Sequence, residues 1–255
     1  NTDLDDLFFR YGVRINNDLI QDQVAGQYPV ITGMAGNQPQ YMQINWPFYP
    51  LINQYADHSI TRNLDATLTR FVSSLDTVKA EGVKKIPLLF TSVYTRKMAS
   101  PVKVGINDFR VASNPAEFVG GSMPVAYLLE GTFTSLYKTR FLPEGVDSTL
   151  FKSKSTSTKM IVISDGDVAR NEINFRTGQP LPLGNDPFTG YTFANQDLLL
   201  NMLAYLTDED GLIETRNKEV KIRPLDKEKI KQEKIFWQVI NVVAPLIILI
   251  LFGIV

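Results

Sequence analysis

The chain has 255 residues, of which 44% are hydrophobic and 21% are charged, a composition typical of globular proteins. Its 26 basic and 27 acidic side chains nearly cancel, so it lacks the concentrated positive charge that nucleic-acid-binding proteins use to contact phosphates. It has no cysteine and one histidine, His58, which excludes disulfides and leaves too few ligands for a zinc site.

The first predicted elements are a short helix and two strands. Residues 2–11 are expected to be helical, because acidic side chains occupy the first turn and Gly12 ends the pattern. Strand-like segments follow at 13–15 and 18–20. Residues 25–50 are rich in Gly, Pro, Gln, Asn and aromatic side chains, which predicts an irregular excursion. That excursion is either a functional loop or an aromatic plug over one edge of a sheet.

The middle of the chain contains two strongly apolar runs. Residues 86–92 read as a buried strand that leads into a polar loop. Residues 123–137 form a long β-prone run with Gly131 inside, which predicts either a strand with a bulge or a hairpin. The serine- and threonine-rich residues 152–159 are typical of an exposed connection.

The last part of the body predicts a strand and a helix. Residues 160–164 are apolar or small without alternation, which favours a central parallel strand buried on both faces. Asn195 is expected to cap a helix through Leu206 that is apolar on most of its circumference. Strands that alternate with helices predict an α/β domain with a parallel or mixed sheet over residues 1–225.

The C-terminal residues differ from the body in composition. Residues 226–234 are highly charged and helix-prone, and we expect them to form a solvated stalk. Residues 235–255 contain no charged side chain, and their length matches the about 20 residues that cross a bilayer. A buried core helix is the alternative. We predict a transmembrane helix over residues 235–255.

The strongest candidate for chemistry is the sequence Asp165-Gly166-Asp167, directly after the predicted strand at 160–164. In open α/β sheets, ligands bind at the carboxyl ends of strands. Two carboxylates spaced in this way, with Asn171 nearby, can present oxygens to ligand hydroxyls or to a cation. The same dipeptide Asp-Gly also favours a purely structural turn. The further acidic positions of a calcium loop are absent from the sequence, so we expect no metal site.

Motifs for enzymatic catalysis are absent from the sequence. It has no G-x-S-x-G pattern, and His58 is the one histidine that could act as a base. No glycine pattern that binds phosphates occurs, so we expect no cofactor and no enzymatic activity. The candidates for binding a ligand or a partner are Asp165, Asp167, Asn171, His58 and Arg62.

Several stretches, in order along nearly the whole chain, resemble one family. They are LFFRYGV (7–13), NNDLIQD (16–22), HSITRNL (58–64), PLLFTS (87–92), AYLLEG (126–131), ISDGD (163–167), NQD (195–197), RNK (216–218) and RPL (223–225). This ordered set is similar to the auxiliary, substrate-binding-like component of the gliding-motility ABC transporter of Bacteroidetes, the GldG family.

The resemblance implies a fold, a location and partners. It implies a flavodoxin-like or glutaminase-like α/β domain without catalytic residues. It also implies a bacterial inner-membrane protein with its body in the periplasm, in contact with membrane lipid and with an ABC permease and an ATPase subunit. Family members have a membrane span at each end, so the chain is expected to be the C-terminal portion of a longer protein. The family's ligand is unknown.

Two other functions fit the sequence. One is a membrane-anchored hydrolase or sugar-binding enzyme that uses Asp165 and Asp167. The other is a purely structural scaffold. A concave polar pocket near Asp165 would distinguish ligand binding from a scaffold. The lysines at 227, 229, 231 and 234 favour a cytoplasmic side for the stalk, against the location that the resemblance implies.

Overall fold

The structure is a computed structural model that describes residues 4–108, 114–174 and 176–208, and five single residues nearer the C-terminus. The elements below belong to one compact unit, Asn1–Asn217. Its helices are α1 (Asp5–Tyr11) and α3 (Asn195–Thr207), with 3-10 turns η1 (Ile106–Asp108), η2 (Pro115–Glu117), η3 (Leu136–Thr139), η4 (Ser148–Leu150) and η5 (Asp167–Ala169).

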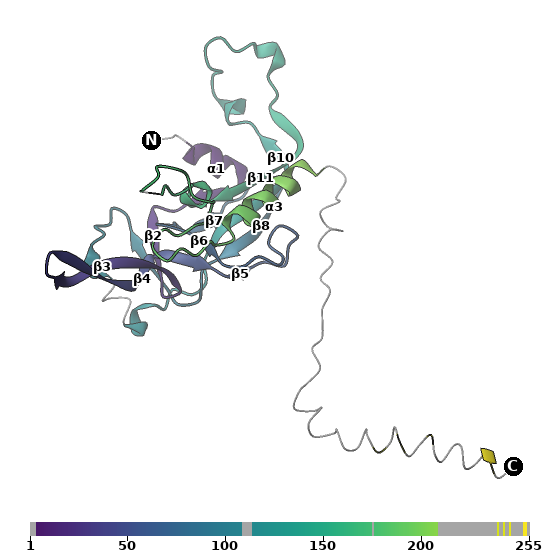
Figure 1. The fold of residues 1–255 in the computed structure, drawn as a ribbon. Coiled ribbons are helices and arrows are strands. Elements are labelled where there is room, and N and C mark those ends of the chain that lie inside the picture. Colours follow the sequence, from purple (N-terminus) through teal and green to yellow (C-terminus); the bar gives the residue numbers. More distant parts are fainter. Residues whose placement is uncertain are drawn as a thin grey trace. The chain divides into compact units, whose positions relative to one another are not determined.

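The core of this unit is a four-stranded sheet in the order β11-β10-β8-β5 (Figure 1). Its strands are β5 (Gln54–Tyr55), β8 (Val83–Phe90), β10 (Pro124–Thr134) and β11 (Lys154–Ile163). All three pairings are antiparallel. The predicted α/β domain with a parallel or mixed sheet is therefore wrong, and so are the flavodoxin-like and glutaminase-like folds. The structure is mostly β, with two α-helices among its described elements.

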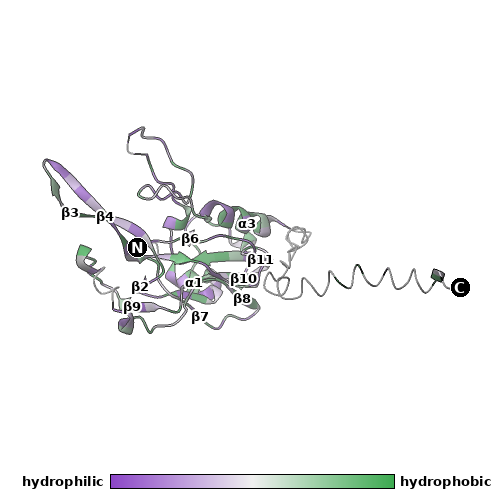
Figure 2. Cartoon of the chain, turned by 60° about the horizontal axis from the view of Figure 1, so that its bottom comes forward, coloured by the Kyte–Doolittle hydropathy of each residue, from purple (hydrophilic) through white to green (hydrophobic). Residues whose placement is uncertain are grey.

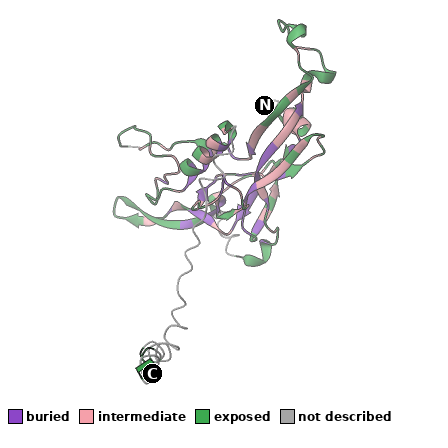
Figure 3. Ribbon diagram, turned by 90° about the vertical axis from the view of Figure 1, so that its right-hand side faces the viewer, coloured by how far each residue is buried: buried purple, intermediate pink, exposed green. Residues whose placement is uncertain are grey.

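The error has a physical cause in the connection between β10 and β11. These strands are joined by the exposed excursion at 135–153, which holds only 3-10 turns (Figure 3). A parallel pair needs a crossover, usually a helix, so strands joined in this way pair antiparallel. In the strand order β11 lies at the edge of the sheet, and within it only Val162 is buried. The Ser- and Thr-rich residues 152–159, predicted to be a connection, instead form much of β11, because threonine suits a half-exposed strand.

β10 is the strand that is buried on both faces. Ala126 and Leu128 belong to one apolar cluster with Leu198 and Met202 of α3. Tyr127 and Leu129 belong to a second cluster, which contains Val13, Leu75 and Val162 and packs against α1. The run at 123–137 was predicted to be a strand with a bulge or a hairpin, and the strand with a bulge is confirmed, since the register shifts between Thr132 and Thr134.

Both of these α-helices were predicted, but the residue expected to cap the N-terminus of α3 was wrong. α1 ends where Gly12 adopts a left-handed conformation with φ of 106°. α3 runs to Thr207, but Asn195 is its first residue and its side chain does not cap it. The helix also buries one face only, because Leu200, Leu203 and Leu206 are exposed.

The described strands also form three smaller antiparallel sheets. β1 (Val13–Ile15) pairs with β7 (Leu75–Thr77), and β2 (Asp18–Asp22) pairs with β9 (Thr95–Ala99). The third has the order β3-β4-β6, with β3 (Ala25–Ala35), β4 (Gln38–Ile52) and β6 (Thr67–Leu68).

The long β3–β4 hairpin replaces the irregular excursion predicted for residues 25–50. Gly36, with φ of 64°, lies in the turn between the strands. At the base of the hairpin, Val30, Ile44, Trp46 and Phe48 form a third apolar cluster, against which Leu19 of β2 and Met98 of β9 pack. Trp46 and Phe48 of this segment therefore form a core with Tyr28 and Tyr49 packed against it, and the Gln- and Asn-rich part forms an exposed ribbon.

The predicted stalk at 226–234 lies outside the described residues, as does nearly all of residues 235–255. Among the helices that the structure does describe, none is long and apolar enough to cross a membrane. The predicted transmembrane helix is thus not a feature of the described fold.

Candidate functional site

Asp165 lies in the turn that follows β11, and its carboxylate is fully engaged by the backbone. One oxygen accepts the N–H of Arg70 at 2.7 Å, and the other accepts the N–H of Asp167 at 2.7 Å. The residue is only 8% exposed. Burial raises the pKa of the Asp165 carboxyl to about 6, against the opposite effect of the two N–H donors.

The charged side chains around this turn pair with one another. Arg170 forms ion pairs with Asp167 at 2.9 Å and with Glu172 at 3.3 Å. Glu172 also accepts a hydrogen bond from Arg70, whose guanidinium lies 5.1 Å from the centre of the Tyr49 ring. The space among these side chains is about 10 Å³, enough for roughly one water molecule. This cluster is a closed network of charges with no room for a substrate.

Asn171 stabilises the long loop at 170–194 through a hydrogen bond within it. Its side-chain amide donates to the carbonyl oxygen of Leu181 at 2.8 Å, and Leu181 N–H donates to the carbonyl of Glu172 at 2.7 Å. Bridges between Ile173 and Pro180, and between Asn185 and Thr192, fold the loop back on itself. The loop therefore has a defined conformation, which Asn171 helps to hold.

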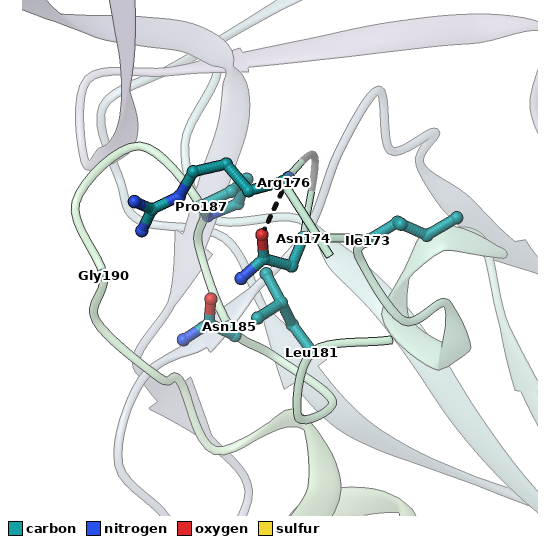
Figure 4. A pocket seen from close by; sticks show the side chains of 7 residues that line it. All are labelled: Ile173, Asn174, Arg176, Leu181, Asn185, Pro187 and Gly190. Atoms are coloured by element: carbon teal, nitrogen blue, oxygen red, sulfur yellow. Dashed lines mark hydrogen bonds between the residues drawn. The ribbon is translucent and has the colours of Figure 1, made fainter. Parts of the chain in front are cut away.

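This loop lines a cavity of about 300 Å³ that is open to solvent and lies next to the charged network. Asn185 lines both the cavity and the small space beside Asp167. The lining residues are Ile173, Asn174, Arg176, Leu181, Asn185, Pro187 and Gly190 (Figure 4). None of these described lining residues is acidic, and Arg176 is the one that carries a positive charge. The cavity thus combines apolar walls with two side-chain amides and one guanidinium.

The other two candidate residues, His58 and Arg62, do not belong to the Asp165 turn. The His58 ring packs edge-on against Tyr205, with ring centres 4.9 Å apart, near the C-terminal end of α3. Arg62 forms an ion pair with Asp57 at 2.9 Å. The Asp165 turn is instead linked to the first residue of α3, because Asn195 donates to the carbonyl of Val168 in η5. The structure therefore brings Asp165, Asp167 and Asn171 together and separates them from the other two candidates.

Several residues of this region were not predicted from the sequence. Glu172 directly follows Arg170-Asn171. This charged run, close behind Asp167, could have identified Glu172 as part of the site. The sequence contains no signal that would connect Arg70 with this site, since Arg70 lies 95 positions before Asp165. The cavity residues Asn174, Arg176 and Asn185 belong to no pattern that marks a binding site, because only the folding of the loop brings them together.

A comparison with protein families gives a match that covers most of the chain. A family profile described as an ABC-type uncharacterized transport system, for the auxiliary component, matches residues 1–202. Searches of curated proteins and of solved structures gave no match. The chain belongs to this family of auxiliary components of ABC-type transport systems.

Proposed function

We propose that this chain is a non-enzymatic, ligand-binding auxiliary subunit of an ABC transporter linked to gliding motility. It works with a permease and an ATPase subunit at the bacterial inner membrane, with its body in the periplasm. Membership of the auxiliary family supports the transporter role. The ordered resemblance to the gliding-motility component supports the finer assignment and the location.

The observation that carries ligand binding is the cavity of about 300 Å³ beside the Asp165 turn. Small-molecule sites are concave, largely apolar and supplied with a few convergent polar groups, and they start at about 300 Å³. A purely structural scaffold needs no such cavity. The polar groups of the cavity also limit the ligand: Arg176 favours an anionic group, while Leu181 and Pro187 favour an apolar portion. We therefore propose a small ligand with one negatively charged group.

The contacts of Asp165 and Asp167 argue against the hydrolase alternative. Acid–base catalysis needs a carboxyl within hydrogen-bonding reach of the substrate. Both Asp165 oxygens accept backbone N–H groups, and Asp167 pairs with Arg170. Asp167 lines a space for about one water, and Asp165 does not line it, whereas glycosidases hold a sugar ring between their two carboxylates.

Co-purification tests the transporter role. The full-length protein, solubilised from its own membrane and captured by a tag, should bring down the ABC permease and ATPase. Recovery of neither subunit would overturn the assignment.

Deletion of the gene tests the link to gliding motility. It should stop colony spreading on agar, and an unchanged spreading rate would show that the protein has no role in gliding.

Native mass spectrometry tests the cavity. The purified protein should carry a small bound species that is lost in Arg176→Glu, which reverses the charge on the cavity wall. Lys152→Glu makes the same charge change at an exposed position outside the lining and should retain the species. Equal occupancy in the two variants would exclude Arg176 from the binding site.

A further inference from the structure

The outer half of the β3–β4 hairpin carries an exposed apolar face. Ile31 lies opposite Tyr41, and Met34 lies opposite Pro39, in the antiparallel register. Residues directly opposite each other share a face, and Pro39 and Tyr41 are two positions apart on one strand, so all four lie on the same face. Ile31, Met34 and Tyr41 are each 63% exposed. We call these four residues the hairpin face.

A bulge creates this face. Ile31 pairs with Tyr41 and Gly33 pairs with Gln40, so Thr32 has no partner in the register. In a regular strand, residues three apart point to opposite faces. The extra residue at Thr32 therefore turns Met34 to the same side as Ile31. Without it, Ile31 and Met34 would point to opposite faces of the hairpin.

The hairpin also lacks charge throughout. Residues 23–56 contain no Asp, Glu, Lys, Arg or His, in a chain that is 21% charged. Figures 1 and 2 show the labelled strands β3 and β4 extending away from the rest of the sheet elements. A protruding ribbon that is exposed and uncharged is complementary to an uncharged, apolar surface, which it can meet without desolvating an ion.

Lipid is a poor occupant for this hairpin. Among the strands that the structure describes, β3 is an edge strand and β6 pairs with β4 at Leu51 and Ile52, so neither long edge of the outer ribbon has a described strand partner. Unpaired backbone N–H and C=O groups in hydrocarbon cost several kcal/mol each. A protein surface can satisfy these groups with its own donors and acceptors.

A second copy of the chain is also disfavoured. A stable interface buries about 800 Å² on each partner. The hairpin face has four side chains, and the neighbouring exposed residues are largely Gln and Asn, so two stacked hairpins would fall short of this area. A larger partner could cover the hairpin face and also contact other surfaces.

We propose that the hairpin face docks onto an uncharged, apolar protein surface of the transporter's permease subunit. Tyr41 is the anchor of this contact, since it combines a large exposed ring with a hydroxyl that can bond at the rim. This inference rests on the proposed function, which supplies the permease as the partner.

Photocrosslinking in intact cells tests the contact. p-Benzoylphenylalanine replaces Tyr41 in the full-length chain, produced together with the permease and ATPase. Tyr94 is the matched control position, because it is 55% exposed and lies outside the hairpin. Irradiation should give a permease adduct from position 41 and none from position 94. An adduct with a second copy, an adduct with lipid, or no adduct from position 41 would overturn the proposal.

Charge insertion separates this inference from the proposed function. The double variant Met34→Lys/Tyr41→Lys should recover about tenfold less permease than the wild type, as expected when an aromatic anchor is lost. Its melting temperature should match that of the wild type, because both side chains are exposed. If the wild type recovers no permease, the proposed function fails. If the wild type and the variant recover it equally, only the docking site is wrong.

Discussion

The carboxylate of Asp165 accepts the backbone N–H of Arg70, 95 positions earlier in the chain, at 2.7 Å. This bond ties the turn after β11 to the segment after β6. The Arg70 side chain then pairs with Glu172, which anchors the start of the loop at 170–194. The two residues thus connect the sheet edge to the wall of the cavity.

The buried Asp165 carboxyl predicts a pH dependence of stability. Its pKa rises from 3.8 in the unfolded chain to about 6 in the fold, so folding favours the protonated form. Its stabilising contribution is complete below pH 3.8 and is lost as the pH rises through 6. Between pH 7 and pH 4, the unfolding free energy of the wild type should increase relative to Asp165→Asn by about 2 kcal/mol. Urea unfolding at several pH values measures it.

Asp147→Asn is the control for this effect. Its exposed carboxylate accepts bonds from the hydroxyl and the N–H of Thr149, which lower its pKa. Its contribution is therefore present above pH 3.8 and is lost as the pH falls. The wild type should lose stability relative to Asp147→Asn on acidification. The same sign in both variants would contradict the assignment of Asp165.

The ion pair of Arg70 with Glu172 should contribute more to the free energy of unfolding than an exposed ion pair. Their side chains are only 11% and 20% exposed, so Arg70→Ala leaves a partly buried Glu172 with Arg170 alone. We expect a loss of about 1–3 kcal/mol in unfolding free energy. Arg14→Ala breaks the exposed pair with Asp76 and should cost less than about 1 kcal/mol. Equal losses in chemical denaturation would show that the Arg70 network does not stabilise the turn.

Asn195 should be the most sensitive asparagine of α3. Its side chain accepts the N–H of Leu68 at 2.9 Å and donates to the carbonyls of Leu68 at 2.9 Å and Val168 at 3.2 Å. Asn195→Ala removes all three bonds and leaves buried backbone groups unpaired, at a cost of about 2–4 kcal/mol. Asn201→Ala removes one bond to Ile60 and should cost about 1 kcal/mol. Thermal and urea unfolding of the two variants should preserve this order.

Gly131 should not tolerate a side chain. It has φ of 136°, and a Cβ atom built on it would lie 1.9 Å from the carbonyl oxygen of Gly82. Gly131→Ala therefore requires β10 to move away from the segment before β8, and we expect a loss of more than about 3 kcal/mol. Gly121→Ala tests positive φ alone, since Gly121 has φ of 74° and open space around it. It should cost about 1 kcal/mol, and comparable melting temperatures for the two variants would refute the steric argument.

Some features of this protein followed from local sequence. The acidic first turn and Gly12 predicted α1, and the apolar run at 195–206 predicted α3, because helix signals lie within a few residues of one another. The run at 123–137 predicted either a strand with a bulge or a hairpin, and β10 is the first of these. The sequence also placed Asp165, Asp167 and Asn171 near one another, since they lie within seven positions.

Other features were decided only by the tertiary structure. Whether residues 160–164 form a central parallel strand or an antiparallel edge depends on the strand they pair with, and apolar content alone does not identify the partner. Residues 25–50 looked irregular because Gln, Asn and Pro are poor strand formers, yet pairing and the third apolar cluster stabilise a hairpin there. The engagement of Asp165 by Arg70 and the cavity at 173–190 also required chain segments to meet in space. Local residue patterns determined the two helices, whereas long-range contacts determined how the strands pair and which surfaces remain for a ligand or a partner.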